Sequence, residues 1–96
     1  IKDGVIDTEE EAVLSRSGYP FALALTLAFS AKESLFKALF PQVQEYMGFD
    51  CARVVMLDNK TLALALTKDA GPCSKGKPFT LAWKMINTQV CTLLVE

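Results

Sequence analysis

The sequence predicts an α+β fold in two layers, with helices packed on one face of an antiparallel sheet. The first half of the chain holds runs rich in Ala, Leu, Lys and Glu at helical spacing, whereas the second half holds short apolar segments separated by turn residues. Helices followed by antiparallel strands are typical of α+β proteins. The chain has 96 residues, of which 51% are hydrophobic and 22% charged, and this is enough for one modest core.

A short first helix is expected to begin at Thr8. Thr8 and Glu11 have the Ser/Thr-x-x-Glu spacing of a capping box, in which both side chains bind backbone N–H groups of the first turn. The helix should stop near Ser17, because Gly18 suits the left-handed position that follows a helix.

A longer second helix is expected from about Phe21 to about Phe40. Pro20 suits the first turn of this helix, because a proline there loses no hydrogen bond. Pro41 is expected to end it and to open a third helix of one or two turns that stops at Gly48.

Four strands are expected in the second half, joined by turns and by a loop over residues 68–78. They are Cys51–Leu57, Thr61–Thr67, Phe79–Ile86 and Gln89–Val95. The second of them alternates between Leu on one face and Ala on the other, which indicates a strand with one buried face. We therefore expect residues 1–96 to form a single domain, with helices over about 8–47 and strands over about 51–95.

Charge and composition exclude several classes of function. Ten basic and eleven acidic residues give a net charge of −1, which argues against nucleic acid as a partner. The chain has no His, so imidazole catalysis and most zinc sites are excluded. The longest apolar run, Phe21–Phe29, is interrupted by Thr26 and is far too short to span a membrane.

The three cysteines, Cys51, Cys73 and Cys91, cannot all pair with one another within one chain. Their spacing matches no metal-binding or redox motif. We interpret them as free thiols, and expect a reducing compartment and therefore a cytoplasmic location.

The segment Gly71–Pro78 nearly matches a phosphate-binding P-loop. Pro78 occupies the position that requires Ser or Thr, and a strand is expected after it where a P-loop opens a helix. We interpret the segment as a solvated loop.

Glu33 and Lys37 lie four residues apart on the second helix and therefore share one face. The spacing alone leaves two interpretations open, of which it favours an ion pair that stabilises the helix. The pair either stabilises the helix as an ion pair, or combines a magnesium ligand with a cation that holds phosphate, as phosphoryl transfer requires.

A sequence motif favours the second interpretation. The string Phe29–Ala38, FSAKESLFKA, resembles the (F/W)-S-x-K-E-(S/A)-x-x-K signature of the 4′-phosphopantetheinyl transferases. The longer run Phe21–Lys37 resembles the enterobactin-synthetase (siderophore) type in particular, and Pro78–Trp83 is similar to its C-terminal strands. The resemblance covers most of the chain and implies a half domain of this family's fold.

The resemblance implies an activity and a set of site residues. These enzymes transfer the 4′-phosphopantetheine arm of coenzyme A to a serine of an apo acyl, peptidyl or aryl carrier protein, with Mg²⁺, in siderophore and nonribosomal peptide synthesis. It implies that Glu33 binds Mg²⁺ or acts as the general base, that Lys37 contacts the phosphates and stabilises developing charge, and that Lys32 lies near the nucleotide phosphates. Helix geometry directs Lys32 about 100° away from Glu33, so Lys32 cannot duplicate the role of Lys37.

The sequence departs from the family at its other metal carboxylates, which lie in an upstream G-(I/V)-D element. Gly4–Asp7 resembles that element, but Asp7 lies only 26 residues before Glu33, which is too close. Asp7 also directly precedes a helix, where it would supply negative charge to the helix N-terminus. We therefore expect the true element to lie before Ile1.

It follows that the chain is expected to be the C-terminal portion of such an enzyme, and to be inactive or nearly so alone. The surface meant for the missing half would expose apolar side chains, so self-association as a homodimer is expected. The alternative is a non-catalytic module of the same fold that binds a carrier protein or dimerises.

Overall fold

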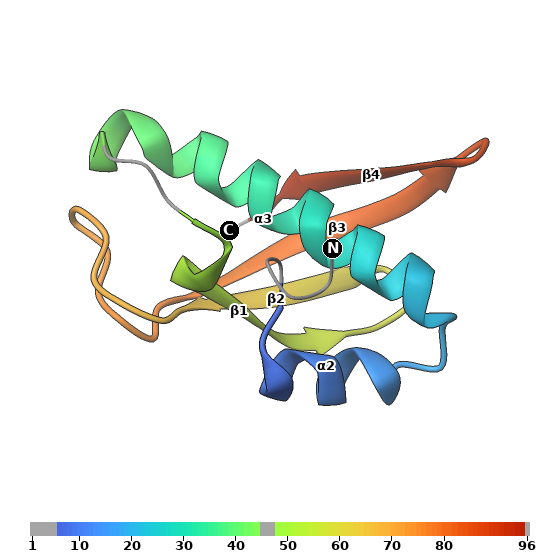
Figure 1. Cartoon of the computed structure of the whole chain (residues 1–96). Helices are drawn as coiled ribbons and strands as arrows, with labels where there is room; N and C mark the ends of the chain where they lie inside the picture. The colour runs from blue at the N-terminus through green and yellow to red at the C-terminus, as the bar shows by residue number, and fades with distance from the viewer. Residues whose placement is uncertain (1–5, 45–47, 96) are drawn as a thin grey trace.

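A computed structural model describes residues 6–44 and 48–95 of the chain, and it has the two-layer α+β arrangement expected from the sequence (Figure 1). The helical elements come first: α2 (Thr8–Ser15), α3 (Phe21–Val43) and the 3₁₀ turn η1 (Phe49–Cys51). The strands follow: β1 (Ala52–Leu57), β2 (Thr61–Leu66), β3 (Pro78–Ile86) and β4 (Gln89–Leu94).

The four strands form one sheet in the order β1-β2-β3-β4, and each is antiparallel to its neighbour. Leu64 at the centre of β2 lies opposite Val54 of β1 and Phe79 of β3. The predicted alternation in β2 is confirmed, because its three leucines are buried and its alanines are half-buried. All three connections join strands that are neighbours in the sheet, so β1 and β4 are its two edge strands. One face of the sheet, called the inner face, packs on the core, and the other is called the outer face.

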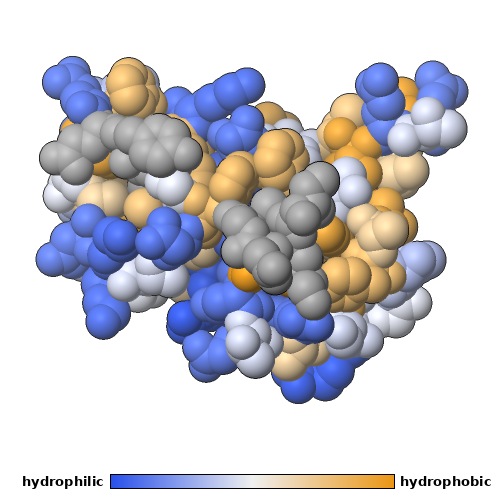
Figure 2. All heavy atoms as spheres, in the orientation of Figure 1, coloured by the Kyte–Doolittle hydropathy of each residue, from blue (hydrophilic) through white to orange (hydrophobic). Residues whose placement is uncertain are grey.

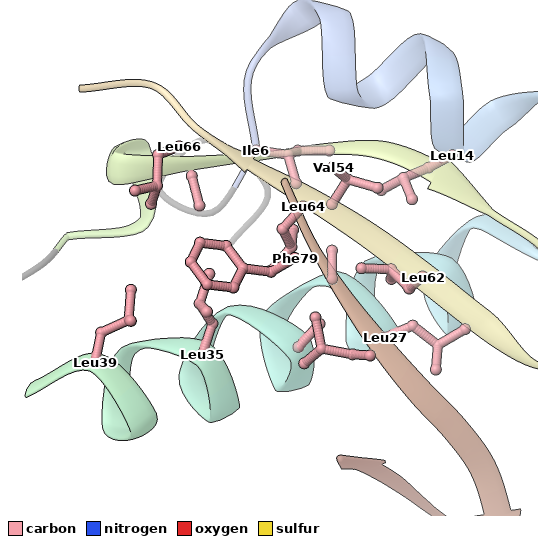
Figure 3. Packing of buried hydrophobic residues seen from close by; sticks show 14 of the residues in the cluster. Ile6, Leu14, Leu27, Leu35, Leu39, Val54, Leu62, Leu64, Leu66 and Phe79 are labelled. Atoms are coloured by element: carbon pink, nitrogen blue, oxygen red, sulfur yellow. The ribbon is translucent and has the colours of Figure 1, made fainter. Parts of the chain in front are cut away.

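The core lies between α3 and the inner face of the sheet. Leucines of α3 point toward leucines of β2 and Phe79 of β3 (Figure 3). The labelled members of this core are Ile6, Leu14, Leu27, Leu35, Leu39, Val54, Leu62, Leu64, Leu66 and Phe79. The helix α3 buries residues at helical spacing from Ala24 to Leu39, so one side of it faces the sheet along most of its length.

The two helices cover different parts of the sheet. In Figure 1, α2 lies beside the edge strand β1, whereas α3 crosses the sheet toward the opposite edge at β4. Leu14 of α2 is fully buried and belongs to the same core as the residues of α3. No helix among the described residues is long and apolar enough to cross a membrane.

The capping box exists, but one residue earlier than predicted. Asp7, not Thr8, is the N-cap of α2, and its carboxylate accepts a hydrogen bond from the backbone N–H of Glu10 at 2.8 Å. Glu10, not Glu11, completes the box by accepting from the N–H of Asp7 at 3.0 Å. Asp caps a helix as well as Ser or Thr does, so the spacing admitted both assignments.

Pro41 does not end α3, and the prediction that a separate helix begins there is wrong. The helix continues to Val43 and ends at Gln44, which has a left-handed backbone (φ 56°) and donates its N–H to the carbonyl of Phe40. Pro41 lies in the last turn, where its missing N–H costs a single hydrogen bond, to the carbonyl of Lys37. Residues 45–47 of the predicted third helix lie outside the described residues.

The segment between β2 and β3 is a loop that leads directly into a strand. Ala70 and Cys73 form an isolated bridge within it, and β3 begins at Pro78. The interpretation of this segment as a surface loop and not a P-loop is therefore confirmed. Gly71, at φ 57°, packs closely against the end of α3.

Candidate functional site

Glu33 and Lys37 lie on the outer side of α3, away from the sheet. The inner side of the helix is taken by buried residues such as Ala31 and Leu35, and both Glu33 and Lys37 are exposed. The ion pairs of the described residues include none between Glu33 and Lys37. The structure therefore presents an exposed carboxylate and an exposed ammonium group four residues apart on α3.

Lys32 has a different environment, although it directly precedes Glu33. Its side chain is fully buried. The Nζ atom lies 2.9 Å from Oε2 of Glu10 and donates hydrogen bonds to Oε1 of Glu10 at 3.1 Å and to the carbonyl of Phe49 at 2.8 Å. The contact of Lys32 with nucleotide phosphates remains a prediction, but this amine is enclosed by protein groups.

Glu10 is the buried centre of this polar cluster, and only 2% of the residue is exposed. Besides Lys32, its carboxylate accepts the N–H of Asp7 at 3.0 Å and the N–H of Val54 at 2.7 Å. Because β1 is an edge strand, the N–H of Val54 has no strand to bond on that side, and Glu10 takes its place. One carboxylate thus joins α2, α3 and β1.

Glu10 is not among the site residues predicted from the sequence, although two signals point to it. Asp7 and Glu10 have capping-box spacing. Lys32 stands in line with Ala28, Leu35 and Leu39 on the apolar side of the helix. A lysine at a core position requires a buried carboxylate, because an unpaired buried charge is strongly unfavourable.

Three hydroxyl groups hold the other edge of α3 to the sheet. Thr92 of β4 lies between Ser30 and Ser34 of the motif, with its Oγ1 atom 3.0 Å and 2.7 Å from their Oγ atoms. The Thr92 hydroxyl also lies within hydrogen-bonding distance, 3.2 Å, of the carbonyl of Ser30. The two serines of the motif therefore fix α3 against β4.

Aromatic side chains flank the exposed pair. The ring of Phe49 packs against those of Phe29 and Phe36, with centroids 5.1 Å and 6.4 Å apart. Phe29 is 44% exposed, so part of this cluster reaches the surface. Figure 2 shows hydrophobic residues among hydrophilic ones on the face of the molecule that carries α3.

The donor set near Glu33 fits part of a magnesium site. No group of three metal-binding side chains occurs within residues 6–44 and 48–95. Mg²⁺ typically takes one or two carboxylates and completes its octahedron with phosphate oxygens and water. Glu33 can supply one such carboxylate, with Lys37 beside it to neutralise phosphate, and further ligands must come from the substrate or from other residues.

Asp7 lies at the N-terminus of α2, where the sequence predicted that its negative charge would stand beside a helix. It caps α2, and its Oδ2 atom pairs with Arg53 at 2.9 Å. Burial opposes ionisation of Asp7, but the N–H of Glu10 and the Arg53 guanidinium outweigh it and lower the pKa of this carboxyl below 3.8. The Asp7 carboxylate is therefore stabilised by contacts within its own fold.

The three cysteines are free, as expected. Cys51 and Cys73 are buried and Cys91 is exposed on β4.

Comparison with known proteins relates the chain to a family of transferases. The family model described as the 4′-phosphopantetheinyl transferase superfamily matches residues 3–92. Enterobactin synthase component D of Salmonella typhi is 37% identical over 90 residues, which cover 94% of this chain and 38% of that protein.

Two further relatives have the same name. Enterobactin synthase component D of Salmonella austin is 38% identical over 90 residues, again covering 94% of this chain and 38% of that protein. The protein of that name in Escherichia coli K12 is 49% identical over 49 residues, or 51% of this chain. The chain spans about 38% of the length of the Salmonella relatives.

Proposed function

The chain belongs to the 4′-phosphopantetheinyl transferase superfamily, and we propose that it carries part of the active site of a Mg²⁺-dependent enzyme that transfers 4′-phosphopantetheine from coenzyme A to a serine of an apo carrier protein. The observation that carries this proposal is the placement of the FSAKESLFKA motif, whose Glu33 and Lys37 are both exposed on one face of α3. The names of the relatives support the synthesis of enterobactin, a siderophore, as the setting, and the proposed partner is an acyl, peptidyl or aryl carrier protein.

In this proposal each exposed residue has a defined role. The serine hydroxyl of the carrier protein attacks the phosphorus that bears the pantetheine arm, a new P–O bond forms, and adenosine 3′,5′-bisphosphate leaves with the electrons of the broken P–O bond. Glu33 either accepts the serine proton or supplies a carboxylate ligand to Mg²⁺. Bound Mg²⁺ would neutralise charge on the pyrophosphate, and Lys37 adds a positive charge at the same place.

We further propose that residues 1–96 correspond to the C-terminal portion of the enzyme and lack most of its activity. The chain matches only 38% of the length of the Salmonella relatives, and the described residues contain no group of three metal-binding side chains around Glu33 or elsewhere. The free thiols support a cytoplasmic location for this enzyme.

The experiment measures the mass of an apo carrier protein after incubation with coenzyme A and Mg²⁺. The full-length protein should add the phosphopantetheine mass, whereas its Glu33→Ala variant and the isolated 96-residue chain should not. Glu9→Ala is the matched control, because Glu9 is an exposed acidic residue on α2 whose side chain is 72% accessible. A full-length protein that leaves several carrier proteins unmodified would reject the transferase proposal.

The second candidate function is a non-catalytic module that binds a carrier protein or dimerises. The outer face of the sheet favours it, because Val55, Leu93 and Val95 are exposed there and nothing in the described part of the chain covers them. We expect the isolated chain to self-associate through this face. Sedimentation velocity across the micromolar range checks this, and a constant monomeric mass would count against it.

The surface around Phe49 is the candidate for carrier docking. Phe49 joins Phe29 and Phe36 in a partly exposed aromatic cluster on the same helix as Glu33. A carrier protein bound there would bring its serine close to the exposed carboxylate.

A further inference from the structure

We propose that Glu10 is a positioning residue for the transfer reaction: its buried ion pair with Lys32 fixes the rotation of α3 and thereby directs Glu33 outward to its Mg²⁺ and coenzyme A site. This inference rests on the proposed function, because it assigns to Glu33 the role described above. It also gives Lys32 a role inside the protein in place of the predicted contact with nucleotide phosphates.

Lys32, Glu33 and Ser34 are consecutive residues of α3 and point in different directions. Lys32 is bound to Glu10 on one edge of α3, and Ser34 is bound to Thr92 on the other edge. Positions two apart on an α-helix point about 200° apart, so the residue between them points about 100° from each. Glu33 is that residue, and it therefore faces away from both attachments and from the sheet.

The carboxylate of Glu10 joins three elements of the fold: α2, α3 and β1. Glu10 lies on α2, Lys32 on α3 and Val54 on β1, and Lys32 in turn donates to the carbonyl of Phe49 in η1. A rotation of α3 would have to break a charge-assisted hydrogen bond between two side chains that are buried from solvent. Apolar contacts alone are less directional, since neighbouring leucines can repack.

The stability of the fold does not by itself explain the buried ion pair of Glu10 and Lys32. A buried ion pair costs desolvation of both charges, and a well-packed apolar pair of similar volume is often equally stable or more stable. The pair formed by Glu10 and Lys32 is therefore a poor device for stability alone. A fixed orientation of the adjacent Glu33 is a function that an apolar pair would fulfil less well.

The experiment compares variants of the full-length protein by two measurements: the Mg²⁺ concentration for half-maximal transfer, and the KM for coenzyme A at saturating Mg²⁺. Glu10→Gln and Lys32→Met should each raise the first by about tenfold, the range found when groups behind a metal ligand are removed. Both should leave the second near its normal value. Glu9→Gln is the matched control and should change neither, because the side chain of Glu9 is at the surface.

The double variant Glu10→Gln/Lys32→Met separates positioning from folding. It carries no unpaired buried charge, so its urea midpoint should recover toward that of the unmodified protein. Its Mg²⁺ requirement should stay raised. If the Mg²⁺ requirement recovers together with the midpoint, the pair is only structural and the proposal is wrong.

Two other results would also overturn the proposal. A raised KM for coenzyme A in Lys32→Met but not in Glu10→Gln would show that Lys32 contacts the nucleotide phosphates. Unchanged amide hydrogen exchange over residues 30–37 in Glu10→Gln would show that the pair does not hold α3. The exchange measurement needs no transferase activity, so it tests the positioning even if the full-length protein transfers nothing.

Discussion

Single residues in this fold are placed by their charged partners as much as by their hydrophobicity. Asp7 shows this at the surface, where it caps α2 and pairs with Arg53 of β1. Arg53 also reaches Glu9 at 3.1 Å, so one guanidinium ties two acidic residues of the helix start to the edge strand. These contacts favour the ionised carboxylate of Asp7 and couple it to folding.

The lowered pKa of Asp7 predicts a pH-dependent contribution to stability. Because the pKa is lower in the folded state than its ordinary value of 3.8, the contribution is fully present above that value and is lost as the pH falls through the folded pKa. Asp7→Asn keeps the cap but cannot ionise, so it should be less stable than the unmodified chain at pH 7. Urea unfolding from pH 2.5 to 7 should show this difference shrinking below about pH 4.

A second variant separates the cap from the charge. Asp7→Ala removes both, and should cost about 1 kcal/mol more of unfolding free energy than Asp7→Asn at pH 7. Equal stability of the two variants would mean that the cap contributes nothing. Asp58, whose pKa is lowered by the backbone N–H groups of Lys60 and Thr61, should retain its own acid dependence in both variants.

The residues also show what sequence reasoning can and cannot establish. The four-residue spacing of Glu33 and Lys37 predicted that they share one face of a helix, and in the structure both lie on α3 and are exposed. Lys32 required knowledge of what lies beside the helix, because burial of its amine depends on Glu10, which is 22 residues away in the chain. A one-dimensional pattern shows that a lysine interrupts an apolar line, but it does not identify the partner.

At the scale of elements, local patterns predicted where the two helices begin better than where they end. The four strands agree with the predicted ranges to within one residue, because alternation and turn residues are local signals. The predicted end of α3 was wrong, because Pro41 is tolerated in a last turn that packs against the loop at Gly71. Gly71 lies 28 residues beyond Val43, the last residue of the helix, so no local signal describes this contact.

The contact between this loop and α3 gives a prediction for Gly71→Ala. Gly71 has a left-handed backbone, and an added Cβ would lie 3.2 Å from the carbonyl oxygen of Gln42 and from Cγ2 of Val43. Gly18→Ala is the control, because Gly18 also has a positive φ but has open space around it. The control should lose about 1 kcal/mol and Gly71→Ala more, as measured by urea unfolding.

If the two glycine variants lose the same free energy, only backbone strain matters and the close packing of the loop on α3 contributes nothing. A larger loss at Gly71 together with faster amide exchange at residues 40–44 would locate the defect at the end of the helix.

For the whole molecule, the main feature is a sheet covered on one face only. The inner face packs on α3, whereas the outer face exposes apolar residues such as Leu93, which is 70% exposed. Cys91 lies on the same edge strand and is also exposed, whereas Cys51 and Cys73 are buried. The three thiols therefore report separately on the surface and on the core.

Thiol reactivity should follow this division. In the isolated chain, at a concentration low enough to keep it monomeric, a disulfide reagent should modify Cys91 rapidly, and should reach Cys51 and Cys73 only as fast as the fold opens. In a longer protein that contains this chain, slow modification of Cys91 would show that another part of that protein covers the outer face. A Cys91→Ser variant identifies the fast thiol, and fast modification of all three in the native chain would contradict the burial described here.

The order of the elements along the chain has a consequence for synthesis in the cell. The apolar side of α3 is complete long before the strands that cover it, since Leu81 follows Leu35 by 46 residues. At the usual speed of translation this interval lasts roughly 2–9 s. During that time the leucines of α3 on the nascent chain have no sheet to pack on. This segment can then be bound by chaperones that recognise apolar nascent chains.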